Sequence, residues 1–203
     1  MHVTLLQHTS LTVCASAIRT CWQSFDKSDE GGPKDRELID RVGNKFKHAS
    51  TLEHLVYTFY IQGISRALLQ ELSRHRLASP SVKSTRYTLK ELKAEESFTC
   101  KDLERAEKYL VFTGDERVDC MSIKALENLR LILNEGISND KAKYCLPESY
   151  KTELTWTINA RSLQNFLTLR SDKSALWEIQ NLAHALYQAL PEEHRYLFSI
   201  HQK

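Results

Sequence analysis

A cluster of cationic and hydroxyl side chains in Ser73–Tyr87, "SRHRLASPSVKSTRY", is the first feature of this sequence that could do chemistry. The stretch holds five basic side chains and six hydroxyl groups, with no Asp, Glu or Gly. Guanidinium and hydroxyl groups together form a donor set that surrounds phosphate oxygens. A solvated charged surface is the alternative, but such surfaces more often mix both signs of charge. We therefore expect this stretch to bind a phosphate group.

The expected phosphate belongs to a small molecule or a cofactor. The chain has six glycines and neither a G-x-G-x-x-G nor a G-x-x-x-x-G-K-[ST] loop, so side chains must hold the phosphate. A single-stranded nucleic-acid platform would need a longer basic track with several aromatic rings, and only Tyr87 is present here. The net charge of +2 also argues against a nucleic-acid partner. A non-catalytic phosphate-ligand or RNA-binding module that uses the basic loop 74–87 remains the alternative.

A second polar group lies in the segment 160–170. Its apolar stripe, at positions i, i+3 and i+4, consists of Leu163, Phe166 and Leu167. The next position on this stripe is Arg170, which either extends into solvent at the helix end or faces a buried acceptor. Arg161 and Asn165 share another side of the helix, and Asn159 is placed to cap it. We expect these side chains to form a second polar wall.

Histidines in "HASTLEH" raise the question of a metal. His48 and His54 are six residues apart, which is not the spacing of a helical zinc pair. Glu53 and His54 are expected at the start of a strand, where neighbouring side chains point to opposite faces. We therefore expect no metal site, while a metal-dependent hydrolase at His48 and His54 remains a third reading.

The five cysteines are scattered, and none forms a C-x-x-C pair. This pattern predicts free thiols with no disulfide framework and no zinc ribbon, as is usual for a cytoplasmic protein. The N-terminus has no signal-peptide pattern, and no segment is long and apolar enough to span a membrane. We expect a cytoplasmic protein without a membrane partner.

The elements that must position these groups indicate one helix-rich α/β or α+β domain over residues 1–203. Hydrophobic periodicity predicts strands over 2–8, 54–62 and 152–159, and helices over 11–21, 36–47, 64–74, 102–112, 121–135, 160–170 and 174–190. Gly63 is expected to end the second strand, and Pro80 makes 78–87 a loop.

Three blocks of the sequence resemble one known family. "RHRLASPSVKS" followed by Arg86 and Tyr87 resembles the signature of the flavin-dependent thymidylate synthases. The blocks "HASTLEHLVYTFYI" and "TWTINARSLQNFLTLRSDKSALWEIQ" resemble the same family, in the same order, and the resemblance runs from about Ala17 to Ala189. The chain departs from the family pattern at Glu71, Ser81, Val82, Thr85 and Lys143.

The resemblance implies a methyltransferase that converts dUMP to dTMP. It implies methylenetetrahydrofolate as carbon donor, and NADPH as reductant through bound FAD. It also implies a small mixed or antiparallel sheet flanked by helices, and a homotetramer whose active sites are shared between subunits.

The resemblance also implies roles for individual residues. The flavin contacts would be His48, Ser50, Glu53, Arg74, His75, Arg76, Asn159, Arg161 and Asn165. The dUMP contacts would be Glu71, Arg74, Val82, Lys83, Ser84, Thr85, Arg86, Lys143 and Arg170. Arg170 would be the catalytic residue, which stabilises negative charge on the uracil ring. Ser84 would bind the phosphate of dUMP, because a serine without an adjacent base is a poor nucleophile.

Overall fold

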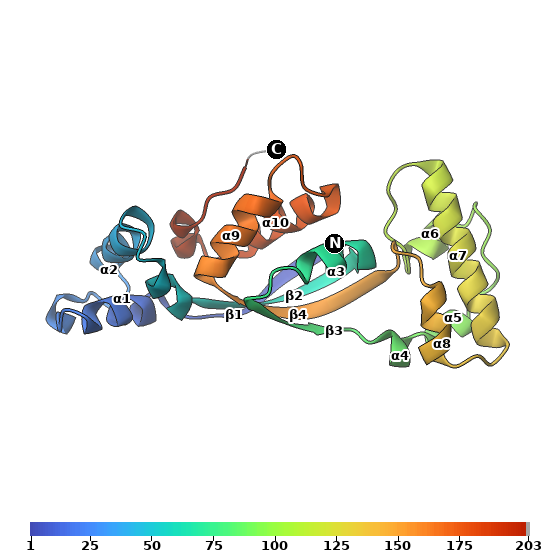
Figure 1. Cartoon of the computed structure of the whole chain (residues 1–203), viewed down its shortest axis with the longest axis horizontal. Coiled ribbons are helices and arrows are strands. Elements are labelled where there is room, and N and C mark those ends of the chain that lie inside the picture. The colour runs from blue at the N-terminus through green and yellow to red at the C-terminus, as the bar shows by residue number, and fades with distance from the viewer. Residues whose placement is uncertain (202–203) are drawn as a thin grey trace. The chain divides into compact units, whose positions relative to one another are not determined.

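The computed structural model describes residues 1–201. A four-stranded antiparallel sheet runs in the order β1-β2-β4-β3. Its strands are β1 (His2–His8), β2 (Val56–Ser65), β3 (Ala78–Val82) and β4 (Lys151–Asn159). The expected small sheet flanked by helices is therefore confirmed (Figure 1).

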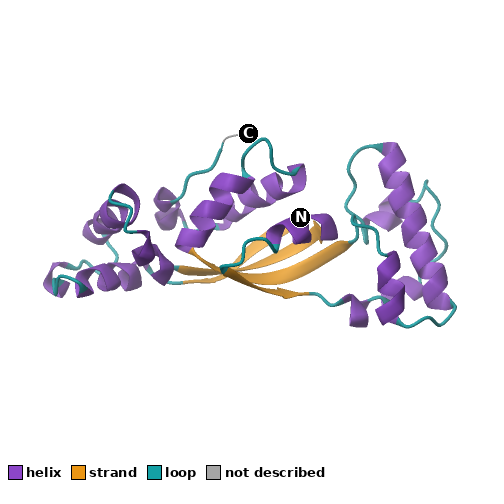
Figure 2. Cartoon of the chain, in the orientation of Figure 1, coloured by secondary structure: helices purple, strands orange, loops and turns teal. Residues whose placement is uncertain are grey.

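The helices connect and flank these strands (Figure 2). The α-helices are α1 (Leu11–Thr20), α2 (Pro33–Ile39), α3 (Arg66–Leu72), α4 (Thr85–Thr88), α5 (Lys90–Lys93), α6 (Leu103–Glu107), α7 (Glu116–Asn134), α8 (Asn139–Ala142), α9 (Ala160–Arg170) and α10 (Trp177–Ala189). Shorter turns of helix are η1 (Phe25–Lys27), η2 (Asp40–Lys45, a π-helix), η3 (Ala49–His54), η4 (Lys143–Cys145) and η5 (Glu192–Leu197).

The chain divides into two compact units. Unit 1 comprises Met1–Ile61, Leu72–Ser81 and the described chain from Thr155 onward, and unit 2 comprises Gln62–Glu71 and Val82–Leu154. Strands β2 and β4 contribute residues to both units. The assignment of 1–203 to a single domain stays a prediction.

In unit 1, helix α9 begins where the sequence predicts. The Asn159 side chain accepts a hydrogen bond from the backbone N–H of Ser162 at 2.9 Å, so it satisfies one of the free N–H groups of the first turn. The predicted apolar stripe of α9 is buried, and Phe166 packs edge-on against Trp156 with ring centroids 5.2 Å apart. This packing fixes which face of α9 carries polar groups.

A buried ion pair joins α1 to α2 in the same unit. Arg19 donates two hydrogen bonds to Oδ1 of Asp35, the shorter at 2.6 Å, and both side chains are nearly inaccessible. Burial alone would raise the pKa of Asp35, but hydrogen bonds from Ser28, Arg19 and Gly31 outweigh it and lower that pKa. Helix α1 contacts η3, which holds two of the expected flavin residues, Ser50 and Glu53.

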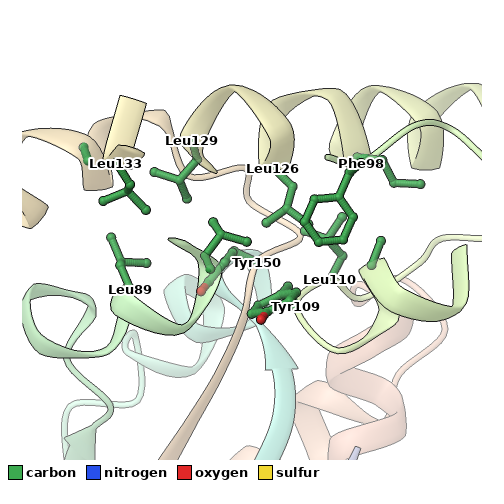
Figure 3. Close-up of a cluster of buried hydrophobic side chains, with 12 residues drawn as sticks. Leu89, Phe98, Tyr109, Leu110, Leu126, Leu129, Leu133 and Tyr150 are labelled. Carbon is green, nitrogen blue, oxygen red and sulfur yellow. The ribbon is translucent and has the colours of Figure 1, made fainter. Parts of the chain in front are cut away.

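In unit 2, α7 supplies Ile123, Leu126, Leu129 and Leu133 to the hydrophobic core. Asp115 caps the helix by accepting from the N–H groups of Arg117 and Val118. Leucines of α7 face Leu89, Tyr109, Leu110 and Tyr150 across the cluster, as Figure 3 shows. Burial of this one face explains why α7 forms despite its many charged residues.

Several predicted elements are wrong in detail. The expected loop 78–87 contains strand β3 and helix α4, and Pro80 is tolerated because β3 is an edge strand that need not donate from every N–H. Gly63 does not end β2, since its φ of 68° lets the strand continue to Ser65. Residues Glu53 and His54 lie in η3 rather than at the start of a strand.

The expectation of five free thiols is also wrong. Cys100 and Cys120, twenty residues apart in sequence and both in unit 2, are joined by a disulfide. The segment after Cys100 folds back on α7, which sequence spacing alone does not reveal. Cys14, Cys21 and Cys145 are free. Within residues 1–201, no helix is both long and apolar enough to cross a bilayer.

Candidate functional site

An arginine-rich cleft lies in unit 1, where the chain after α3 meets α9. Its volume is about 730 Å³, within the range of small-molecule sites. We call it the arginine cleft, and its lining consists of Arg74, His75, Arg76, Leu77, Arg161, Ser162, Asn165, Leu169 and Arg170. The fold thus brings together two of the three sequence blocks, whose lining residues are 84 or more positions apart along the chain.

Arg170 and His75 form the central contact of the arginine cleft. Nε of Arg170 donates to Nε2 of His75 at 2.9 Å, so the proton of a neutral His75 lies on Nδ1. The His75 ring packs edge-on against buried Phe166, with centroids 4.7 Å apart. Arg170 is half-buried at the end of α9, and its guanidinium contacts the His75 ring.

One face of α9 forms a wall of this cleft. Arg161, Asn165 and Leu169 are spaced four residues apart and therefore lie on one side of the helix. The expectation that Arg161 and Asn165 share a side is confirmed. Nη1 of Arg161 also donates to Oε1 of Glu53 at 2.7 Å, which links η3 to α9.

The other expected flavin residues near η3 do not line the cleft. His48 is exposed, and its carbonyl accepts from the Thr51 hydroxyl at 2.9 Å. Ser50 is exposed in η3, and the Asn159 side-chain oxygen is used to cap α9. η3 packs against α9, so these residues lie beside the cleft's helix rather than in its lining.

The two cations of the basic stretch that lie in unit 2, Lys83 and Arg86, are paired with carboxylates. Nζ of Lys83 lies 3.2 Å from Oε1 of Glu153, and Arg86 holds Asp140 through two hydrogen bonds, of 2.7 and 3.3 Å. The stretch itself contains no Asp or Glu, but the fold supplies carboxylate partners to Lys83 and Arg86. Each carboxylate lies 50 residues or more from its basic partner in sequence. The local sequence pattern therefore gives no indication of these ion pairs.

The remaining expected dUMP residues are spread over unit 2. Glu71 belongs to α3, Val82 ends β3, and Lys143 begins η4 with its Nζ 6.0 Å from the Tyr144 ring centroid. Ser84 precedes α4, and its carbonyl accepts from the Thr88 hydroxyl at 3.0 Å. Thr85 and Lys83 line a separate cavity of unit 2.

Sequence reasoning did not identify three lining residues of the arginine cleft. Leu77 and Leu169 are exposed leucines, at 76% and 52% exposure, which offer apolar surface beside the guanidinium groups. Leu169 could have been found from its i+4 spacing to Asn165. Ser162 also lines the cleft, and the only signal for it was its place directly after Arg161.

The chemistry of this lining fits a flavin nucleotide. Four guanidinium groups and no Asp or Glu line the arginine cleft, so its charge favours a multiply anionic group such as a pyrophosphate. The exposed leucines suit a flat ring, and Asn165 can donate and accept toward polar ring edges. Within the described residues, no group of three or more His, Cys, Asp or Glu is placed to hold a metal ion.

Comparisons with known proteins show which family this chain is similar to. Residues 4–194 match the family model described as thymidylate synthase complementing protein. The chain is 77% identical over 203 residues to the flavin-dependent thymidylate synthase of Wolinella succinogenes, covering all of both chains. It is 73% identical over 198 residues to that of Campylobacter jejuni, covering 98% of this chain and 96% of the relative.

A solved structure is also closely similar. It is a crystal structure of thymidylate synthase X from Helicobacter pylori with FAD and dUMP. The two chains are 62% identical and superpose with a TM-score of 0.94, covering 98% of each.

Proposed function

This chain belongs to the thymidylate synthase complementing protein family, the flavin-dependent thymidylate synthases, and from that premise we propose how its residues perform the reaction. The enzyme is an FAD-dependent methyltransferase that converts dUMP to dTMP, for dTMP biosynthesis. The observation that carries this proposal is the arginine cleft, which gathers the Arg74–Arg76 block and the α9 block around one cavity.

On the flavin side, we assign binding to the arginine cleft and to the neighbouring η3. The guanidinium groups of Arg74 and Arg76 bind the flavin phosphates as charge-assisted donors. Asn165 orients the ring, and the Arg161–Glu53 ion pair fixes the α9 wall against η3. The full proposed flavin set is His48, Ser50, Glu53, Arg74, His75, Arg76, Asn159, Arg161 and Asn165.

On the substrate side, Arg170 is the proposed catalytic residue. Its guanidinium stabilises negative charge that develops on the uracil ring, and its contact with His75 holds it in place. The nucleotide is bound by Glu71, Arg74, Val82, Lys83, Ser84, Thr85, Arg86 and Lys143. Arg86 offers a fork of donors to phosphate, whereas Lys143 supplies a single point charge.

We propose that uracil is methylated without a covalent bond to the protein. No described side chain donates to or accepts from the Ser84 hydroxyl, so no base activates it, and Ser84 serves as a phosphate ligand. No cysteine lines the arginine cleft. Buried Cys14 is held as a neutral thiol, because burial raises its pKa to about 12.

The co-substrates complete the proposed reaction. When bound, the flavin would supply a hydride to the uracil that Arg170 activates and that receives the transferred carbon. Methylenetetrahydrofolate provides that carbon, and NADPH provides the electrons. The protein's own part is to hold the uracil beside Arg170 and to keep the phosphates anchored.

We further propose that the enzyme is a cytoplasmic homotetramer with active sites shared between subunits, and that residues 1–203 of each subunit form one domain. The proposed dUMP ligands belong to both units of the chain, Arg74 and Arg170 to unit 1 and the others to unit 2. Light scattering should give four chains per particle. Mixing and refolding Arg170→Ala with Arg86→Ala chains should restore part of the activity, because some sites then receive both wild-type residues. No recovery in verified mixed tetramers would contradict shared sites.

A spectroscopic experiment tests the proposed function. Purified protein should be yellow, should bleach anaerobically with NADPH, and should form dTMP from dUMP and methylenetetrahydrofolate. A colourless protein that binds neither added FAD nor dUMP would contradict the proposed function. If its affinity for RNA also fell steeply with salt concentration, the result would support the RNA-binding alternative.

A further inference from the structure

Unit 2 contains a second cavity, of about 210 Å³. We call it the mixed-charge cavity, and its lining consists of Gln62, Gly63, Lys83, Thr85, Thr88, Glu91, Lys108, Tyr109, Tyr150, Lys151, Thr152 and Glu153. Lys83 and Thr85 also belong to the proposed dUMP set. The inference below uses lining residues outside that set, and it does not rest on the proposed function.

Most charges around this cavity are already neutralised. Lys83 pairs with Glu153, and Nζ of Lys108 lies 2.9 Å from Oε1 of Glu95, just outside the lining. Two lining charges remain without an ion pair among the described residues.

The two unpaired charges have opposite sign. The ammonium of Lys151 donates to the backbone carbonyl of Glu107, which leaves its charge uncompensated. The carboxylate of Glu91 has no ion-pair partner within residues 1–201. The cavity therefore presents one positive and one negative group to whatever occupies it.

One buried hydroxyl of this lining, that of Thr152 in β4, has no hydrogen-bond partner in the described chain, and Thr152 is 3% exposed. The hydroxyl of Tyr150, a residue that is 8% exposed, also makes no hydrogen bond within the described chain. Tyr109 differs, since its hydroxyl donates to Glu95 at 2.6 Å. Figure 3 shows the Tyr150 hydroxyl pointing away from the leucines of α7. A buried hydroxyl is rarely left unsatisfied, so a bound group is expected to complete the hydrogen bonding of Thr152.

Tyr150 is suited to act as a neutral hydrogen-bonding group. Burial, together with the neighbouring Tyr109 and Glu91, raises the pKa of Tyr150 to about 12. The phenol therefore stays protonated at neutral pH, and the negative charge of Glu91 is close enough to influence it.

We propose that the mixed-charge cavity binds a small zwitterion with one carboxylate and one ammonium group, the chemistry of a free α-amino acid. The ligand carboxylate lies toward Lys151, and its ammonium group lies toward Glu91 and the oxygen of Tyr150. An anion alone would add negative charge beside Glu91, and a cation alone would add positive charge beside Lys151. The volume corresponds to roughly seven waters at ~30 Å³ each, enough for an amino acid.

Calorimetric titration of the holoenzyme, saturated with dUMP to occupy the nucleotide site, tests this proposal. Probes are L-amino acids with uncharged side chains, each compared with the same molecule lacking either charged group. For L-valine these are 3-methylbutanoate and isobutylamine. At least one amino acid should bind about tenfold or more tightly than either of its analogues. Absence of amino-acid binding, or equal binding of a singly charged analogue, would overturn the proposal.

Variants then locate the binding. Lys151→Gln and Glu91→Gln should each weaken the amino acid about tenfold, and Tyr150→Phe, which keeps the buried ring, should weaken it several-fold. Lys124→Gln and Glu116→Gln change exposed residues of α7 outside the lining and should leave affinity unchanged. Unchanged affinity in all three cavity variants would place the binding elsewhere and contradict the inference. Because binding is measured directly, failure of dTMP formation would not affect this result.

Discussion

The arginine cleft of unit 1 and the mixed-charge cavity of unit 2 use cations in different ways. Four arginines and no carboxylate line the cleft, where Glu53 pairs with Arg161 from outside the lining, whereas both lysines and glutamates line the cavity. A lining of one sign needs an anion to offset its own repulsion, while a lining of both signs is nearly neutral by itself. The difference separates a site built for phosphates from one that suits a zwitterion.

The type of cation differs as well. Arginine presents a rigid fork that fits two oxygens at once, and lysine presents a compact charge on a flexible stem. Arg86 in unit 2 already uses its fork on Asp140, so a nucleotide phosphate must compete with that carboxylate. Position along the sequence is therefore a poor guide to which cation is available.

The largest expected effect concerns the scaffold that holds the cleft. His194 in η5 is buried, and its Nδ1 shares a hydrogen bond of 2.8 Å with the Tyr57 hydroxyl. Burial, with some contribution from nearby His8, lowers the pKa of His194 to about 4. η5 is tied to α9 because Gln164 donates to the Leu197 carbonyl at 2.6 Å.

Because the folded pKa of His194 is below the unfolded value of about 6.5, its contribution to stability is complete above pH 6.5. It is lost as pH falls toward 4, at up to ~1.4 kcal/mol per pH unit and about 3 kcal/mol in all. Urea unfolding from pH 7 to 4.5 measures this slope, and His194→Gln should flatten it. Exposed His2→Gln is the control; an unchanged slope in His194→Gln would contradict the assignment.

Arg170→Ala tests the arginine cleft itself. Loss of a charge-assisted interaction in the transition state should lower kcat about a hundredfold, while FAD absorbance is retained. Arg41→Ala removes an exposed guanidinium of the same unit and should leave kcat unchanged. A kcat near that of the wild type in Arg170→Ala would remove its catalytic role.

Arg86→Ala has a smaller expected effect, on substrate binding. The KM for dUMP should rise about tenfold, and the free energy of unfolding should fall by less than ~1 kcal/mol, because the pair with Asp140 is exposed. Arg117→Ala breaks another exposed pair, with Asp115, and should change neither quantity appreciably. An unchanged KM for dUMP in Arg86→Ala would show that Arg86 does not bind the nucleotide and that its role is limited to the ion pair with Asp140.

Sequence patterns predicted the elements whose periodicity is long and whose ends carry strong signals. Helix α9, with its Asn159 cap and buried stripe, is the clearest case. Strand β3 was missed because its residues are polar and contain Pro80, and only its edge position makes that composition acceptable.

The candidate site was predicted in part. The Arg74–Arg76 block and the α9 block do meet in one cleft, but the pairing of Arg86 with Asp140 depends on a contact 54 residues apart in sequence. The Cys100–Cys120 disulfide likewise depends on tertiary folding. Local composition shows which groups are present, and the fold decides which of them remain available.

Binding of FAD to apoprotein variants tests the central claim most directly. Titration followed by flavin absorbance should show that Arg74→Ala/Arg76→Ala binds FAD at least tenfold more weakly than the wild type, while Lys151→Gln in unit 2 binds it normally. Equal losses in both variants, or full FAD affinity in the double variant, would contradict the assignment of the arginine cleft to the flavin.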